Sequence, residues 1–311
     1  MKLETLLPVS DGHARVQTLF TGISRGTERL VSQGAVPESE WPVMRAPYQD
    51  GDFPFPVKYG YSAAGRVVEG PEKMLGQSVF CLYPHQEQFV VPLDALIQIP
   101  AAVPLRRATL AANMETALNA VWDAAALPGA KVAVVGAGIV GLLTARLVAR
   151  LPAASVTVID INRDRLAVAE DFGCTFALPG DQPTDCDVVF HTSASAAGLQ
   201  TAIACAGLEG TVVEMSWYGT KPVTVDLGGR VHSKRLRIVA SQVGRVAPAM
   251  RPRWTHRRRL KAALELLADP VLDHLVRDEI AFDEAPESLP IVLNQDYQAV
   301  PPVIAYSATT D

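Results

Sequence analysis

The stretch from Lys131 to Asp160 reads KVAVVGAGIVGLLTARLVARLPAASVTVID and decides how this half of the chain folds. It opens on an apolar, β-branched run at 132–135, which is short enough to be a buried parallel strand. A glycine-rich turn comes next, followed by a helical run at 142–151 and a second strand at 155–159. This succession of strand, turn, helix and strand predicts the first βαβ unit of a doubly wound α/β sheet.

Each glycine of the turn has a physical task. Gly136 allows the tight passage from strand to helix, Gly138 lets a pyrophosphate approach the backbone, and Gly141 lets the helix lie close to the sheet. The N-terminus of the helix offers unpaired N–H groups and a partial positive charge to the phosphates. Because all parts of the pattern are in place, the stretch predicts a dinucleotide site.

The carboxylate that ends the second strand bears on the choice of cofactor. Asp160 lies 19 residues after Gly141, where it can accept both ribose hydroxyls of an adenosine and would repel a 2′-phosphate. The sequence therefore predicts NAD, and Arg163 and Arg165 close by keep NADP open as the alternative. The predicted cofactor contacts are Gly136, Gly138, Ile139, Val140, Gly141, Asp160, Ile161, Asn162, Thr192, Ser193, Trp217 and Gln242.

The composition narrows the class of protein. Hydrophobic residues make up 49% of the 311 positions, charged residues 20%, and the net charge is −5, so nucleic acid and anionic membranes exert no general attraction. The cysteines lack C-x-x-C spacing, which argues against a disulfide framework or a cysteine-rich zinc lobe. With no visible signal peptide or membrane span, we expect a cytoplasmic protein with a small-molecule substrate and neither a nucleic-acid nor a membrane partner.

The pattern of predicted secondary structure changes near the middle of the chain. Up to about residue 115, glycines and prolines punctuate short strands, predicted at 16–20, 65–68, 78–82 and 88–91, and 104–123 is mostly helical. From 131 onwards strands and helices alternate. Five parallel strands are predicted at 131–135, 155–159, 187–191, 210–215 and 235–240, and the helices at 140–151, 163–172 and 197–205. The last strands end at Thr192, Ser193, Ser216, Trp217, Ser241 and Gln242, where we expect nicotinamide.

The C-terminal part again has the pattern of short strands and turns predicted for the N-terminal part. An arginine-rich helix is predicted at 252–268, whose charges we interpret as a solvated face, and 280–306 has strands and turns. We therefore expect a β-rich domain at 1–118 and 270–311 and a dinucleotide-binding domain at 119–269.

Three segments carry a resemblance to a known family. Thr21-Gly-Ile-Ser-Arg-Gly-Thr-Glu28 resembles T-G-I-C-G-T-D, and Phe55-Pro-Val-Lys-Tyr-Gly-Tyr-Ser62 resembles F-P-x-x-x-G-H-E, both of the medium-chain dehydrogenase/reductase superfamily. Val158-Ile-Asp-Ile-Asn-Arg-Asp164 is similar to the ribose-binding strand end of its NAD-using members. The resemblance implies a GroES-like domain, a Rossmann domain and a homodimer that pairs through strand 235–240.

The departures from the family pattern concern its zinc. Ser24 or Arg25 stands where the family has a cysteine ligand and Tyr61 where it has a histidine, while Glu115 alone matches the third ligand. Serine, arginine and tyrosine are poor zinc ligands at neutral pH, so the resemblance implies a zinc-free member. An alternative metal set of Cys81, His85 and Glu115 stays open, although Cys81 is also typical of a small buried apolar residue.

Without zinc, hydrogen-bond donors must stabilise the reacting oxygen. The predicted catalytic residues are Tyr61, Thr27, His85 and Glu115. Each has a structural alternative: packing for Tyr61, a helix N-cap for Thr27, a surface loop for His85 and an ion pair with Arg25 for Glu115. His191 and His232 are interpreted as structural.

The function hypothesis follows from these residues and from the resemblance. We expect a zinc-independent, NAD(H)-dependent oxidoreductase that interconverts a secondary alcohol and a ketone on a specialised metabolite. Segments 23–28 and 59–62 resemble the bacteriochlorophyllide hydroxyethyl dehydrogenase branch of the superfamily, which favours alcohol chemistry. Reduction of a C=C bond in a quinone or enone, and a non-catalytic redox sensor that binds the dinucleotide, remain as alternatives.

Overall fold

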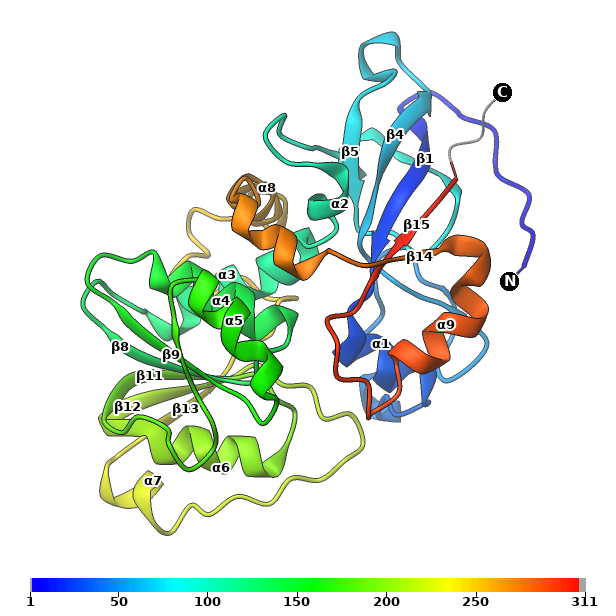
Figure 1. Cartoon of the computed structure of the whole chain (residues 1–311). Helices are drawn as coiled ribbons and strands as arrows, with labels where there is room; N and C mark the ends of the chain where they lie inside the picture. Colours follow the sequence, from blue (N-terminus) through cyan, green and yellow to red (C-terminus); the bar gives the residue numbers. More distant parts are fainter. Residues whose placement is uncertain (1, 308–311) are drawn as a thin grey trace. The chain divides into compact units, whose positions relative to one another are not determined.

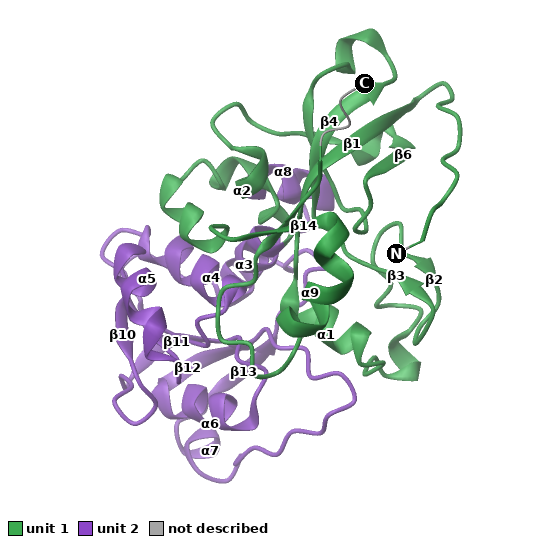
Figure 2. Ribbon diagram, turned by 45° about the vertical axis from the view of Figure 1, so that its right-hand side comes forward, with its two compact units in different colours: residues 1–112, 264–311 green, residues 113–263 purple. Residues whose placement is uncertain are grey.

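Two units make up the chain in the computed structural model, which describes residues 2–307. The first unit comprises the residues up to 112 together with those from 264 onwards, and the second comprises 113–263 (Figure 2). The sequence had placed these divides at 118/119 and 269/270. Within the described residues, no helix combines the length and apolar character needed to cross a bilayer.

The first unit is built on a seven-stranded sheet. Its strand order is β14-β15-β1-β4-β5-β7, with β6 paired to β1, and all pairs are antiparallel except β14 with β15. The strands are β1 (His13–Gly22), β4 (Ala63–Glu69), β5 (Ser78–Cys81), β6 (Gln88–Pro92), β7 (Ile97–Gln98), β14 (Glu279–Ala281) and β15 (Val303–Ala305). Buried residues from β1, β4, β5 and β6 form its core. The four N-terminal strands predicted from the sequence are confirmed.

Short elements complete the first unit. They are α1 (Arg25–Ser32), α2 (Leu105–Ala108), the β2–β3 pair (Asp50–Gly51 and Val57–Lys58), α9 (Ala285–Val292) and the 3-10 turns η1 (Glu38–Glu40), η2 (Glu72–Met74), η3 (Leu93–Ala95), η5 (Pro270–Leu275) and η6 (Phe282–Glu284). Helix α9 corrects the prediction of strands and turns alone in this tail. Pro286 lies in its first turn, where no intrahelical N–H bond is needed, and Pro290 lies inside it, so the prolines concealed the helix.

The second unit is a six-stranded parallel sheet in the order β10-β9-β8-β11-β12-β13. The strands are β8 (Lys131–Val135), β9 (Ser155–Ile159), β10 (Thr175–Ala177), β11 (Cys186–His191), β12 (Ala206–Glu214) and β13 (Arg237–Ala240). Numbered within the sheet, this is the order 3-2-1-4-5-6 of dinucleotide-binding folds. The predicted count of five strands was wrong by one, because β10 is a three-residue strand whose pairing with β9 leaves little pattern in the sequence.

Helices lie on both faces of this sheet. The helical elements of this part of the chain are α3 (Ala111–Ala124), α4 (Ile139–Ala149), η4 (Arg163–Arg165), α5 (Leu166–Asp171), α6 (Ala196–Cys205), α7 (Arg230–Ser233) and α8 (His256–Leu266). Figure 1 shows α4 and α5 on one face and α6 on the other. The predicted helix at 252–268 begins later, at His256, because the hydroxyl of Thr255 accepts the N–H of Arg258 at 3.1 Å and fixes the start there.

Candidate dinucleotide site and candidate catalytic residues

The turn between β8 and α4 has the shape that its glycines predict. Gly136 has a φ of +110°, and its N–H donates to Ile159 O at 2.8 Å, which ties the turn to the end of β9. A Cβ at Gly136 would lie 2.7 Å from Thr192 Oγ1. The same hydroxyl donates to the carbonyl oxygen of Gly136 at 2.9 Å, so Thr192 braces the turn from β11.

The other two glycines of the turn, Gly138 and Gly141, differ in the space around them. A Cβ at Gly141 would lie 1.9 Å from the carbonyl oxygen of Gly136, so helix α4 can approach the turn only without a side chain there. A Cβ at Gly138 would meet nothing within 4 Å, although Gly138 is the N-cap residue of α4. The turn is therefore tightly packed behind Gly141 and open at Gly138, on the side that a phosphate would approach.

Asp160 lies directly after β9 and fastens the same turn. Its two carboxylate oxygens accept the N–H groups of Ala137 at 2.6 Å and Asn162 at 2.8 Å. A carboxylate has about four acceptor sites, so capacity is left for two ribose hydroxyls. Ile161 is 82% exposed, which leaves an apolar surface next to this carboxylate. The side chain of Asn162 accepts the N–H of Asp164 and begins η4.

The remaining predicted cofactor residues lie at the carboxyl ends of β11, β12 and β13. Ser193 follows β11 and is exposed, Trp217 is partly buried in the loop after β12, and Gln242 is exposed after β13. Ile139 and Val140 form the first turn of α4. The structure thus brings all twelve predicted residues to the carboxyl-terminal edge of one parallel sheet.

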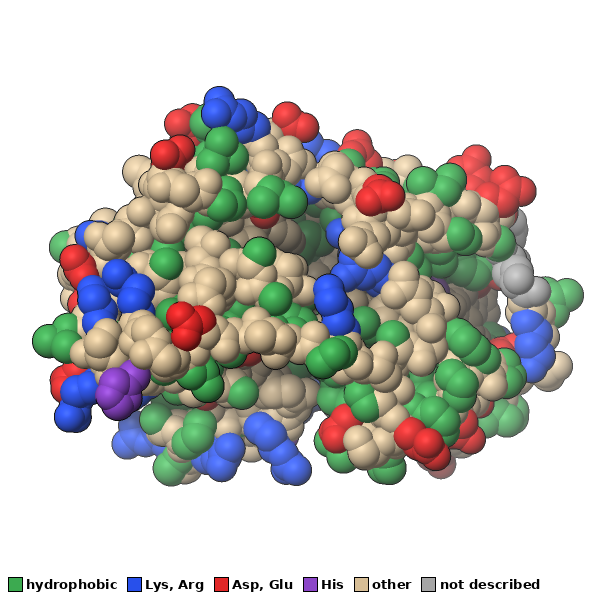
Figure 3. All heavy atoms as spheres, turned by 90° about the horizontal axis from the view of Figure 1, so that it is seen from below, with side chains coloured by type: hydrophobic (Ala, Val, Ile, Leu, Met, Phe, Trp, Pro, Cys, Tyr) green, Lys and Arg blue, Asp and Glu red, His purple; other side chains and the backbone are tan. Residues whose placement is uncertain are grey.

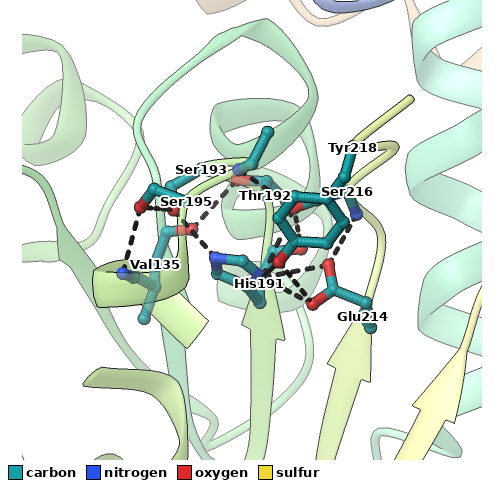
Figure 4. Close-up of polar contacts among 10 residues, drawn as sticks. Val135, His191, Thr192, Ser193, Ser195, Glu214, Ser216 and Tyr218 are labelled. Atoms are coloured by element: carbon teal, nitrogen blue, oxygen red, sulfur yellow. Dashed lines mark hydrogen bonds and ion pairs between the residues drawn. The ribbon is translucent and has the colours of Figure 1, made fainter. Parts of the chain in front are cut away.

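A polar network at this edge was missed by the sequence reasoning. His191, fully buried, places Nδ1 2.8 Å from Glu214 Oε2 and Nε2 2.8 Å from Ser193 Oγ (Figure 4). Glu214 also accepts the N–H of Ser216 at 2.7 Å and the hydroxyl of Tyr218 at 3.1 Å. The signal that could have found it is the register of the two strands, which sets His191 opposite Glu214.

The charge of this network is set by its hydrogen bonds. Burial would raise the pKa of Glu214, but the hydrogen bonds that the carboxylate accepts from His191 and from the N–H of Ser216 outweigh it, so the pKa lies below its usual value. Burial is also the main cause that raises the pKa of Tyr218, which remains a protonated donor at neutral pH. The histidine that the sequence reasoning set aside is therefore held between an anionic carboxylate and a hydroxyl.

In the first unit, Tyr61 and Thr27 come together. The phenol of Tyr61 has hydrogen bonds with the side chains of Ser24 and Thr27, and the ring meets Tyr59 edge-on with 5.9 Å between centroids. Burial raises the pKa of Tyr61 to about 12, and the two hydrogen bonds only partly oppose this shift. The N-cap residue of α1 is Ser24, so the alternative of Thr27 as a helix N-cap is wrong.

His85 belongs to a buried group rather than to a surface loop. Its Nε2 lies 3.1 Å from Glu28 Oε2, its Nδ1 lies 2.7 Å from Thr21 Oγ1, and its side chain is 13% exposed. Glu28 also accepts the N–H of Ser24 at 2.7 Å, and Thr21 lies 3.1 Å from the hydroxyl of Tyr306. The alternative of an exposed loop histidine is therefore wrong, and Glu28, which joins His85 to the start of α1, was missed.

Glu115, on α3, belongs to the second unit, whereas the other three predicted catalytic residues belong to the first. Arg259 Nε donates to its carboxylate at 2.9 Å, and the guanidinium also donates to Asn119. Arg25, the partner considered for Glu115 from the sequence, donates to the backbone carbonyls of Val292 and Asn294. Burial raises the pKa of Glu115 in spite of the arginine. The contact between the Glu115 carboxylate and Arg259, both buried, ties α3 to α8.

In the part of the chain that the structure describes, no three His, Cys, Asp or Glu side chains are grouped to hold a metal ion. The alternative set of Cys81, His85 and Glu115 is therefore not assembled. Cys81 is buried in β5, and burial raises the pKa of its thiol to about 12. At neutral pH it is a small apolar side chain in the core of the first unit.

On the face drawn in Figure 3, acidic and basic side chains are interspersed among uncharged ones. Polar side chains converge at the edge of the parallel sheet and around Tyr61.

The strand order, the open glycine turn and the acidic end of β9 define a Rossmann unit of the dinucleotide-binding class. Comparisons with known proteins agree. The family described as alanine dehydrogenase/PNT, C-terminal domain, matches residues 108–213. Galactitol 1-phosphate 5-dehydrogenase of Escherichia coli K12 is 26% identical over 201 residues, which are 60% of this chain and 58% of that protein. The match thus spans less than two thirds of that relative.

Solved structures match the fold over nearly the whole chain. A dehydrogenase from Sinorhizobium meliloti 1021 bound to NADP has a TM-score of 0.73 at 19% identity and covers 96% of this chain and 93% of its own. An alcohol dehydrogenase from E. coli CFT073 in complex with NADH has a TM-score of 0.74 at 16% identity and covers 97% and 94%. This chain is therefore similar to dehydrogenases, in line with the resemblance of its sequence motifs to the medium-chain dehydrogenase/reductase superfamily.

Proposed function

We propose that this protein is an NAD(H)-dependent, zinc-independent oxidoreductase that interconverts a secondary alcohol and a ketone on a small specialised metabolite. The observation that carries the proposal is the pairing of an open backbone at Gly138 with a partly unsatisfied carboxylate at Asp160. NAD(H), when bound, supplies or accepts the hydride. The relatives named above are dehydrogenases, which supports this class of reaction.

The choice of NAD over NADP is argued from charge. The two structural neighbours hold NADP and NADH respectively, so the fold accommodates either cofactor. In this chain Asp160 is fixed by Ala137 and Asn162 at the position where a 2′-phosphate would come. Two negative charges in that position repel each other, which supports NAD(H).

In the proposed reaction Tyr61 takes the role of the zinc ion that the family resemblance implies. The side chains of Ser24 and Tyr61 do not suit zinc, because both are hydroxyls. The phenol, whose pKa is raised to about 12, stays protonated at neutral pH. The protonated phenol can instead donate a hydrogen bond to a carbonyl oxygen. As the carbonyl carbon gains the hydride, its π pair moves onto oxygen, the phenol gives that oxygen its proton, and solvent returns a proton to the phenolate.

Thr27 and His85 position this donor. Thr27 and Ser24 share a hydrogen bond with the phenol, and Ser24 is fixed by Glu28, which His85 holds in turn. His85 is therefore proposed as a positioning residue. Glu115, by contrast, is proposed to stabilise the fold through Arg259 and not to meet the substrate.

Strand β13 supports a homodimer. It lies at the edge of the parallel sheet and its side chains are largely exposed, including Ile238 at 43%. An uncovered edge strand offers unpaired N–H and C=O groups to a second copy. We propose that two chains pair along β13.

The proposed reaction is tested with protein dialysed against a chelator. Zinc is measured by atomic emission, and NADH oxidation is followed at 340 nm with a panel of ketones and ketoses, with the reverse reaction on the matching alcohols. We expect turnover of at least one carbonyl compound without stoichiometric zinc. Activity that appears only when one zinc per chain is restored would contradict the metal-free mechanism, and no turnover of any compound, with NADH still bound, would favour the redox sensor.

A further inference from the structure

The network around His191 determines which way each hydrogen bond at the end of β11 runs. Glu214, whose pKa is lowered, is a carboxylate with acceptors only. Because Glu214 Oε2 lies 2.8 Å from His191 Nδ1, that nitrogen must carry the proton. In the neutral imidazole the other nitrogen, Nε2, is then an acceptor.

The acceptor role of His191 Nε2 fixes the direction of the next hydrogen bond, to Ser193. Its Oγ lies 2.8 Å from His191 Nε2, so the hydroxyl donates its proton to the imidazole when the imidazole is neutral, which is the form that this inference requires. Ser195 Oγ, 3.0 Å away, accepts the N–H of Gly198 and can donate its own proton to Ser193. One acceptor site of Ser193 Oγ remains, and the residue is exposed.

The surrounding backbone is shaped to admit this hydroxyl. A Cβ at Gly198, in the first turn of α6, would lie 2.0 Å from Ser193 Oγ and 3.0 Å from His191 Nε2. The absence of a side chain at Gly198 is therefore what allows the serine and the imidazole to meet. The groups that the structure sets against the imidazole are the carboxylate of Glu214, the phenol of Tyr218, and serine hydroxyls.

We propose that the chain from Glu214 through His191 makes Ser193 Oγ a dedicated hydrogen-bond acceptor for an N–H or O–H donor on the nicotinamide half of the dinucleotide. The proposal rests on the dinucleotide binding proposed above. Ser193 lies at the carboxyl end of β11, the strand beside β8 on the side away from β9, where a doubly wound sheet holds that half of the cofactor. Two donors are available there: the carboxamide N–H and the hydroxyls of the adjoining ribose.

The test compares three ligands on Ser193→Ala. NAD carries both donors, 3-acetylpyridine adenine dinucleotide lacks the carboxamide N–H, and ADP lacks the whole nicotinamide half. We expect Ser193→Ala to weaken NAD by about fivefold to tenfold, the effect of one net hydrogen bond, and to leave ADP unchanged in calorimetric titrations. An unchanged affinity for the acetylpyridine analogue then assigns the donor to the carboxamide, and an equal loss for it assigns the donor to the ribose.

His191→Asn tests whether the histidine acts through the serine. Asparagine can still donate to Glu214 but offers no acceptor at the place of Nε2, so the serine proton is released. We expect the same selective loss of NAD affinity, with no further loss when His191→Asn is added to Ser193→Ala. His191→Gln, which can return an acceptor there, should recover part of the affinity. Thr201→Ala, on the exposed side of α6, is the matched control and should change none of the three affinities.

Three outcomes would overturn the proposal. The first is an unchanged NAD affinity in Ser193→Ala. The second is an equal loss for NAD and ADP, which would mean that the serine supports the sheet edge in general. The third is a full additional loss from His191→Asn in the Ser193→Ala background. If the native protein binds neither NAD nor ADP, the proposed function itself fails, and this inference with it.

Discussion

Gly138 and Gly141, the second and third glycines of the G-x-G-x-x-G turn, allow a matched pair of substitutions with opposite expected effects. Gly141→Ala would place a Cβ 1.9 Å from the carbonyl oxygen of Gly136, whereas ordinary contact begins at 3.4 Å. The helix and the turn would have to separate by more than an ångström. Such overpacking costs about 3 kcal/mol or more, and for a unit of this size it lowers Tm by roughly 6–12 °C.

Gly138→Ala meets no obstacle, because its φ is −74° and nothing lies within 4 Å of the added carbon. We expect a free energy of unfolding within about 1 kcal/mol of that of the native protein. Alanine is a poorer N-cap residue than glycine, but it also lowers the conformational entropy of the unfolded chain, and the two effects nearly cancel. NADH affinity, however, should fall about tenfold or more, because the methyl group displaces a phosphate from one or two charge-assisted N–H bonds.

The assay is thermal unfolding followed by fluorescence titration with NADH on the same preparations. Gly141→Ala should melt early, while Gly138→Ala should melt normally and bind weakly. The reasoning is refuted by native affinity in Gly138→Ala, because the open face would then not be the phosphate site. Native stability in Gly141→Ala would refute the packing of α4 on the turn.

The other predictions concern catalysis, acid stability and assembly. Tyr61→Phe should lower kcat about a hundredfold in initial-rate assays with an unchanged melting curve, because the proton donor is lost, and native rates would remove Tyr61 from the mechanism. The Arg107 side chain holds Asp273 through two hydrogen bonds of 2.8 and 2.7 Å, which chiefly lowers the pKa of Asp273. The contribution of Asp273 is full above its unfolded pKa of about 3.9 and is lost as the pH falls through the lower folded pKa. Because the Asp273 side chain is 57% exposed and solvent screens the pair, Asp273→Asn should cost about 1 kcal/mol or less in urea unfolding at pH 6, and much less at pH 2. Ile238→Pro should convert the proposed homodimer to a monomer in light scattering. The N–H of Ser241 points to β12, so alternation along the strand turns the N–H of Ile238 to the free edge. A dimer that persists in this variant would exclude pairing along β13.

Most of the fold could be predicted from local patterns in the sequence. The strands β8 and β9 match their predicted bounds because each is an unbroken β-branched run between clear turn residues. The glycine turn and Asp160 were predictable for the same reason, since every group that shapes them lies within one βαβ unit. What was missed has weak local signal: β10 spans three residues, and α9 contains two prolines.

The side-chain partnerships were harder to predict because they join distant positions. His191 and Glu214 are 23 residues apart and meet only through the register of β11 and β12. Arg259 and Glu115 are 144 residues apart on two helices, so the sequence suggested Arg25 as the partner instead. Periodicity places each element, but which polar groups satisfy one another depends on packing that one sequence does not encode locally.

The central claim is that Asp160 and the open turn at Gly138 hold an adenine dinucleotide whose adenosine ribose carries no 2′-phosphate. It is tested most directly by measuring the Kd of the native protein for NADH and for NADPH by fluorescence titration at one ionic strength. We predict that NADH binds at least about tenfold more tightly, because two anionic groups roughly 4 Å apart repel by several kcal/mol before screening. Equal affinities, or tighter binding of NADPH, would contradict the account.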